Sequence, residues 1–135
     1  MQVVNSLVKN RSVVVVDDDD ITRELLRGIL RSAGLHVIGE GSDGARAVDL
    51  FQKLKPDVLC LDIDMPEMNG LEALAKVREI SADAIVLMIT AATTANNVRQ
   101  AITARASGII AKPFNTAKIV AEIERAITRA QAAKK

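Results

Sequence analysis

The fold is decided by the stretch SVVVVDDDD, residues 12–20, in which four acidic residues directly follow a continuous β-branched run. A short unbroken apolar run is typical of a strand buried on both faces of a parallel sheet. Outward from it, short apolar runs alternate with longer amphipathic stretches along the rest of the chain. We expect strands over 12–16, 35–39, 57–61, 84–89 and 108–111, each followed by a helix.

Residues that favour helix N-caps or turns precede each expected helix. They are Asp19 and Asp20, Ser42 or Asp43, the Asn69-Gly70 turn, Thr93 or Thr94, and Asn115 or Thr116. With 135 residues the chain is expected to form one domain. Five strand–helix units in one domain imply a parallel sheet with helices on both faces and right-handed crossovers.

The composition excludes several classes of protein. Tyr and Trp are absent, and Cys60 and His36 are the only cysteine and histidine, so stacking platforms, disulfide frameworks and Cys/His zinc clusters are not expected. The net charge of +1 argues against a general grip on nucleic acid, although residues 1–90 carry −5 and residues 91–135 carry +6. No apolar run is long enough to span a membrane and no signal peptide is evident, so we expect a cytoplasmic protein that binds neither membrane nor nucleic acid directly.

Chemically active residues follow four of the five expected strands. Open parallel sheets place ligands at the carboxyl ends of their strands. Here those ends carry the pair Asp17 and Asp18, then Asp62, then Thr90, and finally Lys112. The sequence therefore predicts that acidic groups, a hydroxyl and an ammonium meet at one edge of the sheet.

Such a cluster has a definite chemistry. Each pair of carboxylates repels at roughly 4 kcal/mol when they are 4 Å apart in an effective dielectric near 20, so the group calls for a cation. Oxygen ligands without His or Cys select a hard ion, Mg²⁺ or Mn²⁺. A lysine and a threonine can hold phosphoryl oxygens, and a carboxylate can itself accept a phosphoryl group.

Four segments then identify a family resemblance: VVVVDDDD, LDIDMPEMNG, LMITA and ASGIIAKPF. In this order they resemble the receiver (CheY-like) domain of bacterial two-component response regulators. The resemblance implies a flavodoxin-like, doubly wound α/β fold: a five-stranded parallel sheet in the order 2-1-3-4-5 with five helices, as a three-layer α/β/α sandwich. It places the receiver domain at residues 11–131, after a flexible segment 1–10 and before a tail 132–135.

The resemblance also implies a role for each site residue. Asp62 corresponds to the phosphoacceptor, Thr90 to the switch hydroxyl and Lys112 to the lysine that pairs with phosphoryl oxygens. The metal ligands implied are Asp18 directly, Asp17 chiefly through water, Asp62 itself, and the main-chain carbonyl of Asp64. Pro113 corresponds to a proline that is often cis in the family, and Ala91 and Ile109 are the further positions associated with the switch.

Three positions depart from the family pattern. Ile109 stands where an aromatic residue is usual, so a hydroxyl-bearing side chain cannot couple to Thr90 there. Asp64 adds a carboxylate where a neutral residue is often found, and Ala92 is small. We expect these departures to alter the lifetime of the phosphorylated form.

The implied function is a phosphorylation-activated signalling switch rather than an enzyme. Asp62 would receive a phosphoryl group, with Mg²⁺, from a histidine kinase or a histidine phosphotransfer protein, and would later lose it by self-dephosphorylation. The surface formed by helix 94–105, strand 108–111 and the last helix would change for a downstream partner that the sequence does not identify. The protein would be a monomer or a phosphorylation-dependent dimer, and either a stand-alone regulator or a piece of a longer one.

Other readings remain open at this point. The chain could be a degenerate receiver that docks without phosphorylation. Asp62-Ile63-Asp64 also imitates the DxD signature of aspartyl-nucleophile phosphatases of the haloacid dehalogenase type, although that motif normally follows the first strand. A flavodoxin-like FMN carrier would need a phosphate-cradling loop where this chain has four aspartates.

Overall fold

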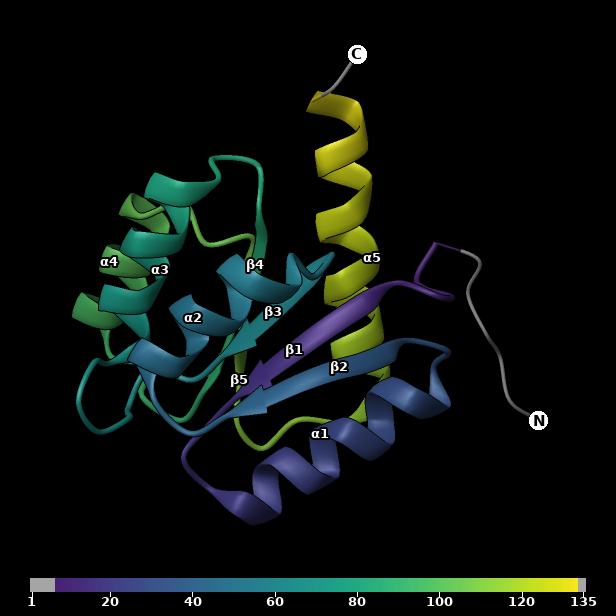
Figure 1. Cartoon of the computed structure of the whole chain (residues 1–135), viewed down its shortest axis with the longest axis horizontal. Helices are drawn as coiled ribbons and strands as arrows, with labels where there is room; N and C mark the ends of the chain where they lie inside the picture. The colour runs from purple at the N-terminus through teal and green to yellow at the C-terminus, as the bar shows by residue number, and fades with distance from the viewer. Residues whose placement is uncertain (1–6, 134–135) are drawn as a thin grey trace.

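The computed structural model describes residues 7–133 and confirms the predicted sheet (Figure 1). Five parallel strands lie in the order β2-β1-β3-β4-β5. They are β1 (Ser12–Val16), β2 (His36–Gly41), β3 (Val58–Leu61), β4 (Ile85–Thr90) and β5 (Gly108–Ala111). The arrowheads of β1 and β2 point toward the lower left of Figure 1, so the expected functional edge lies at that end.

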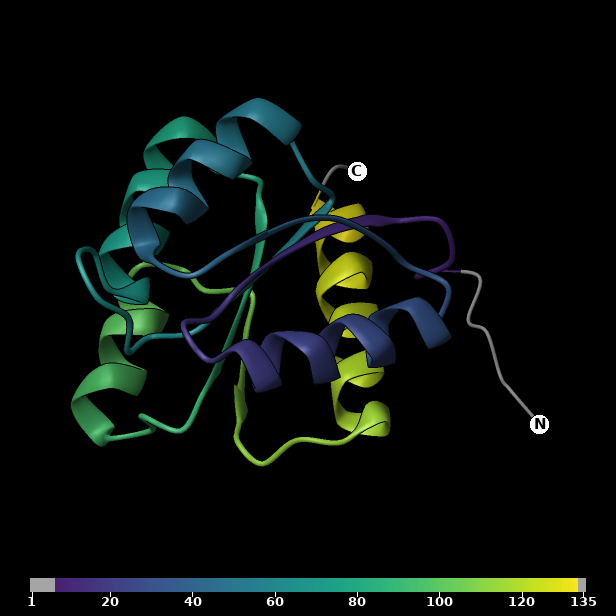
Figure 2. The ribbon, with the colours of Figure 1, turned by 60° about the horizontal axis from the view of Figure 1, so that its bottom comes forward.

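Five helices cover the two faces of the sheet, which completes the flavodoxin-like sandwich (Figure 2). One face carries α1 (Asp20–Ser32) and α5 (Thr116–Ala133), and the other carries α2 (Gly44–Leu54), α3 (Gly70–Ile80) and α4 (Ala95–Thr103). In β1, Val13 and Val15 join the apolar cluster under α1 and α5, while Val14 and Val16 join the cluster under α2 and α3. This two-sided burial explains the unbroken apolar run of β1.

Every helix begins at a side chain that caps it. The caps are Asp19, Asp43, Asn69, Thr94 and Asn115, and each accepts a hydrogen bond from the backbone N–H three residues later. The structure thus selects Asp43 over Ser42 and Thr94 over Thr93. Gly70, expected in a turn, is the first residue of α3, and Glu72 completes a capping box with Asn69.

Several strand bounds differ from the prediction because backbone pairing, rather than apolar character, sets them. β2 begins at His36 and continues to Gly41, which pairs with Val16 and whose carbonyl accepts from the Asp17 N–H. β4 begins at Ile85 and includes Thr90, which pairs with Ala111. Asp57, expected in β3, precedes the strand.

The described chain begins in contact with the domain and ends within α5. Val8 is fully buried in the cluster under α1 and α5, and the Asn10 N–H donates to the Gly34 carbonyl, so residues 7–10 of the expected N-terminal segment contact the domain. At the other end α5 runs through residues 132 and 133 of the expected tail. Residues 1–6 and 134–135 lie outside the described part.

Candidate functional site

Two buried acids stand at the carboxyl ends of neighbouring strands. Asp17 directly follows β1 and Asp62 directly follows β3, and each is held by its backbone: Asp17 N–H donates to Gly41 and Asp62 N–H donates to Val16. Both side chains are buried, with relative exposures of 1% for Asp17 and 6% for Asp62. The carboxyl end of the sheet therefore holds two carboxylates that have little contact with water.

Lys112 joins these two acids. Its ammonium Nζ donates to Asp17 Oδ2 at 2.7 Å and to Asp62 Oδ2 at 3.0 Å. The other carboxylate oxygens accept from backbone amides: Asp17 Oδ1 from Asp19 N–H at 2.9 Å, and Asp62 Oδ1 from Ile63 N–H at 2.7 Å. Residues 50 and 95 positions apart in the chain thus form one hydrogen-bonded group.

In both Asp17 and Lys112, burial and hydrogen bonding shift the pKa in opposite directions. Burial raises the pKa of Asp17, and the hydrogen bond from Lys112 opposes that rise without cancelling it. Burial alone would lower the pKa of Lys112, but the hydrogen bonds and charges of Asp17 and Asp62 outweigh it and the net pKa is raised. Lys112 therefore remains an ammonium, and one positive charge faces more negative charge than it can balance.

Asp18 completes a group of three carboxylates. One oxygen from each of Asp17, Asp18 and Asp62 lies within 4.8 Å of the others, and Asp18 is exposed. With Lys112 protonated, the ionised group carries a net charge of −2, which a divalent cation would neutralise. Three oxygen donors without His or Cys suit a hard ion, so the residues present fit a metal of the Mg²⁺ kind.

Thr90 lies at the same edge, but its hydroxyl is hydrogen-bonded to the backbone and not to the acids. It is completely buried, and its Oγ1 accepts a hydrogen bond from the Ala92 N–H at 3.0 Å. In the part of the chain that the structure describes, this hydroxyl forms no hydrogen bond with Asp62 or Lys112. The Thr90 carbonyl does accept from the Lys112 N–H at 3.0 Å, so the ends of β4 and β5 are joined directly beside the acids.

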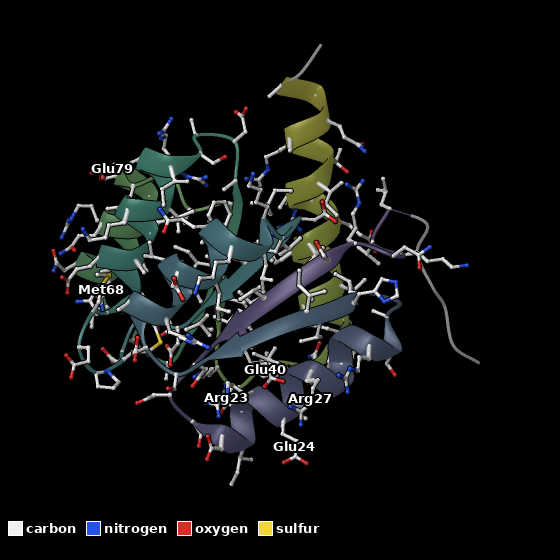
Figure 3. All side chains as sticks on the ribbon, viewed as in Figure 1. Arg23, Glu24, Arg27, Glu40, Met68 and Glu79 are labelled. Atoms are coloured by element: carbon white, nitrogen blue, oxygen red, sulfur yellow. The ribbon has the colours of Figure 1, made fainter. Side chains whose placement is uncertain are left out.

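Arg23 supports the acidic loop, and the sequence analysis did not single it out. Its Nη1 donates to the Asp17 carbonyl at 2.6 Å, and its other nitrogens pair with Asp20 and, at 3.7 Å, with Glu40. Arg27 pairs with the same Glu40 at 2.7 Å, so α1 is linked to β2 next to the site (Figure 3). The three-residue spacing of Asp20 and Arg23 on a predicted helix could have indicated their ion pair. The pairing of Arg23 with Glu40 in β2 could not be seen before the fold was known.

The loop after Asp62 is held by two close backbone contacts. Gly70 N–H donates to the Ile63 carbonyl, and a Cβ on Gly70 would lie 1.9 Å from the Asp62 carbonyl oxygen. Gly44 N–H donates to the Met68 carbonyl, and a Cβ there would lie 2.2 Å from that oxygen. The first turns of α2 and α3 thus fix the loop that follows Asp62.

The remaining predicted residues surround this group without joining it. The side chain of Asp64 is exposed and lies outside the carboxylate group. Ala91 and Pro113 are exposed, Ile109 is half-buried, and the Lys112–Pro113 peptide bond is cis. Cys60 is a buried core residue, and His36 is exposed and bonded to Asn10, as expected for residues outside the site.

Comparisons with known proteins agree with this arrangement. Residues 13–124 match the family described as the response regulator receiver domain. The chemotaxis protein CheY of Thermotoga maritima is 37% identical over 110 residues, which cover 82% of this chain and 92% of that protein. Protein CcdB of Bacillus subtilis is 39% identical over 113 residues, which cover 84% of this chain and 94% of that protein.

Solved structures show the same likeness. The crystal structure of the CheX–CheY–BeF3–Mg²⁺ complex from Borrelia burgdorferi matches with a TM-score of 0.83 and 30% identity, over 89% of this chain and 92% of that chain. The receiver domain of the response regulator NarL from Mycobacterium tuberculosis matches with a TM-score of 0.81 and 34% identity, over 89% of this chain and 98% of that chain. Among the described residues no helix is both long and apolar enough to cross a bilayer. The chain therefore belongs to the family of CheY-like response regulator receiver domains.

Proposed function

We propose that this protein is a phosphorylation switch in which Asp62 accepts a phosphoryl group from a histidine kinase or a histidine phosphotransfer protein. The observation that carries the proposal is the contact of Lys112 with both Asp17 and Asp62, beside the exposed carboxylate of Asp18. A buried acid with a neighbouring ammonium and an accessible edge is suited to phosphoryl transfer, which depends on positioning and on charge neutralisation.

The proposed transfer involves one bond made and one bond broken. A carboxylate oxygen of Asp62 attacks the phosphorus, the P–N bond to the donor imidazole breaks, and its electron pair stays on the nitrogen. An acyl phosphate forms, which water later hydrolyses. Mg²⁺, or Mn²⁺, when bound, would neutralise charge on the phosphoryl oxygens, and Asp17, Asp18, Asp62 and the Asp64 carbonyl would hold it.

Lys112 has a role before and after transfer. Before transfer it neutralises part of the charge on Asp62, which makes approach of an anionic donor less unfavourable. After transfer, Asp62 has lost its carboxylate charge to the new bond, and the phosphoryl oxygens become the stronger acceptors. We therefore infer that Nζ moves from Asp62 Oδ2 to a phosphoryl oxygen.

Thr90 provides a route from the site to α4. Its Oγ1 accepts from the Ala92 N–H, and the Ala92 carbonyl accepts from Asn97 Nδ2 at 3.0 Å, so Thr90, Ala92 and Asn97 form a hydrogen-bonded chain into the first turns of α4. If the Thr90 hydroxyl turns to a phosphoryl oxygen, it gives up Ala92 and loosens this chain. The α4–β5–α5 surface would change for a downstream partner as a result.

The decisive experiment is labelling with acetyl phosphate or phosphoramidate in the presence of Mg²⁺, followed by mass mapping. The expected result is one added phosphoryl group on Asp62, lost in Asp62→Asn and retained in Asp83→Asn, which removes an exposed carboxylate remote from the site. Persistent labelling of Asp62→Asn would move the acceptor elsewhere. An unlabelled wild-type protein would favour an adaptor that docks without phosphorylation.

The phosphatase alternative has less support from the geometry. Its DxD chemistry uses the second aspartate as acid and base beside the first. Here the Asp64 side chain is exposed and outside the carboxylate group, whereas Asp17 and Asp18 lie within it. Turnover of a small phosphate ester that depends on Asp64 would be needed to favour that function.

A further inference from the structure

A second charged pocket lies at the opposite edge of the sheet from the acidic group. Its volume is about 640 Å³, and it is bordered by the end of α3, the α3–β4 loop, the start of β4, the α4–β5 turn and the last turns of α5. In Figure 1 the α3–β4 loop and the end of α5 stand at the top, away from the arrowheads of β1 and β2. Nothing in the proposed phosphoryl chemistry uses this pocket.

Three arginines line it: Arg78 from α3, Arg105 from the α4–β5 turn and Arg129 from α5. Asp83 is the single carboxylate in its lining, and within residues 7–133 none of the three guanidinium groups lies in an ion pair. Burial lowers the pKa of Arg78 and the positive charge of Arg105 lowers it further, so like charges gather here without full compensation.

Arg78 holds the rim of the pocket in place. Its Nε and Nη2 donate to the Arg105 carbonyl at 3.1 and 2.6 Å, and its Nη1 donates to the Ala84 carbonyl. Arg129 Nη1 approaches the Ser107 carbonyl at 3.4 Å. The α3–β4 loop and the α4–β5 turn are therefore tied together, and the exposed guanidinium groups of Arg105 and Arg129 are presented on a fixed frame.

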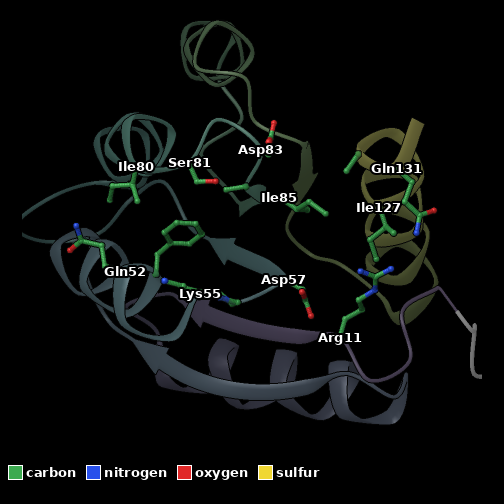
Figure 4. Close-up of a pocket in the computed structure, with 14 residues that line it drawn as sticks. Arg11, Gln52, Lys55, Asp57, Ile80, Ser81, Asp83, Ile85, Ile127 and Gln131 are labelled. Atoms are coloured by element: carbon green, nitrogen blue, oxygen red, sulfur yellow. The ribbon is translucent and has the colours of Figure 1, made fainter. Parts of the chain in front are cut away.

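A pocket of mixed character adjoins the arginines: isoleucines line it together with Phe51 and with the charged Arg11, Lys55 and Asp57. Its volume is about 440 Å³, and it shares Asp83, Ala84, Ile85 and Ala130 with the first pocket. Figure 4 shows the side chains of Ile80, Ile85 and Ile127 around it, with Ser81 and Gln131 at its border. The two adjoining pockets beside α5 are together called the groove; it has arginines at one end and isoleucines among polar side chains at the other.

We propose that this groove binds a nucleoside monophosphate, with the phosphate at the arginines and the flat heteroaromatic base among the isoleucines and polar side chains. Guanidinium groups match phosphate oxygens in geometry and charge. The two volumes lie in the range of about 300–1,000 Å³ that small-ligand pockets occupy. Because the site is remote from Asp62, its occupation does not depend on the proposed function.

The test is a titration followed by amide NMR without divalent metal, with 5′-AMP as the probe and adenosine and inorganic phosphate as its two halves. We expect AMP to bind at least tenfold more tightly than either half and to shift amides near Arg105, Ser107, Ile85 and Ile127. The Arg105→Ala/Arg129→Ala variant should weaken AMP binding at least tenfold. The Arg99→Ala/Arg125→Ala control removes the same charge from residues outside both pockets and should change it less than twofold.

Three results would each overturn the proposal: equal weakening by the two double variants, shifts confined to the acidic group around Lys112, or AMP binding no tighter than inorganic phosphate. Labelling of Asp62 by acetyl phosphate should be the same in the Arg105→Ala/Arg129→Ala variant as in the wild type. That measurement separates failure of this groove from failure of the phosphoacceptor, since either can fail while the other stands.

Discussion

Replacing Gly70 by alanine is the sharpest probe of how the phosphoacceptor is positioned. The new Cβ would lie 1.9 Å from the Asp62 carbonyl oxygen and 2.9 Å from Ile63 Cα, whereas ordinary contact begins at 3.4 Å. The two backbone segments must separate by about 1.5 Å to relieve the first contact. A misplacement of about 1 Å can lower a rate roughly 100-fold, and overpacking destabilises a protein by about 1–3 kcal/mol.

We therefore expect Gly70→Ala to slow labelling of Asp62 by acetyl phosphate about 100-fold and to lower the free energy of unfolding by about 1–3 kcal/mol. Urea titration establishes that the variant is folded under the conditions of the labelling assay. Gly28→Ala is the matched control, because Gly28 lies in α1 with nothing within 4 Å of its Cβ position. That change should stabilise by about 0.5–1 kcal/mol and leave the labelling rate unchanged. A folded Gly70→Ala protein that is labelled at the wild-type rate would refute the reasoning.

Three further predictions follow from other parts of the structure. Burial raises the pKa of the Cys60 thiol from 9.0 to about 12, so iodoacetamide at pH 8 should alkylate it far more slowly in the native than in the urea-unfolded protein, and equal rates would contradict the burial. The free energy of unfolding should also fall above pH 9, because only the unfolded state then loses the thiol proton. Asn97→Ala removes the hydrogen bond to the Ala92 carbonyl, worth about 1 kcal/mol, and should favour the state in which Thr90 has released Ala92. Labelling by small phosphodonors should then be up to about fivefold faster, and an unchanged rate would show that α4 is not coupled to the site. Decay of the phosphorylated form should differ from wild type in Asp64→Asn or Ala92→Glu, measured as loss of label over time, and identical decay in both would show that these positions do not set the lifetime.

Much of the fold was predictable because apolar runs and caps report local structure directly. The run at 13–16 indicated a strand buried on both faces, and Asp43 and Thr94 were among the caps considered. The end of β2 was not predictable from apolar character, since Glu40 and Gly41 are not apolar and join the strand only through pairing with β1. Bounds that depend on a partner strand need the sheet itself.

The site shows the same division. The strand-end rule predicted that Asp17, Asp62, Thr90 and Lys112 would share one edge, and the structure places all four there. It could not predict that the Thr90 hydroxyl accepts from the Ala92 N–H instead of bonding to Asp62 or Lys112, because rotamers depend on packing. The support of the Asp17 carbonyl by Arg23 was also hidden, since a guanidinium on an amphipathic helix gives no sequence signal of its target.

The weak anchoring of α4 has a consequence for the dynamics of the domain. Within this helix only Ala101 is buried, whereas Ile102 has a relative exposure of 66%. Local opening of a segment costs less free energy when it exposes little apolar surface, so α4 should be a separate unit of low stability. Its amide protons should exchange with deuterium well before those of the central strands. A helix that detaches at so little cost could be captured in more than one orientation by different proteins without unfolding the sheet beneath it.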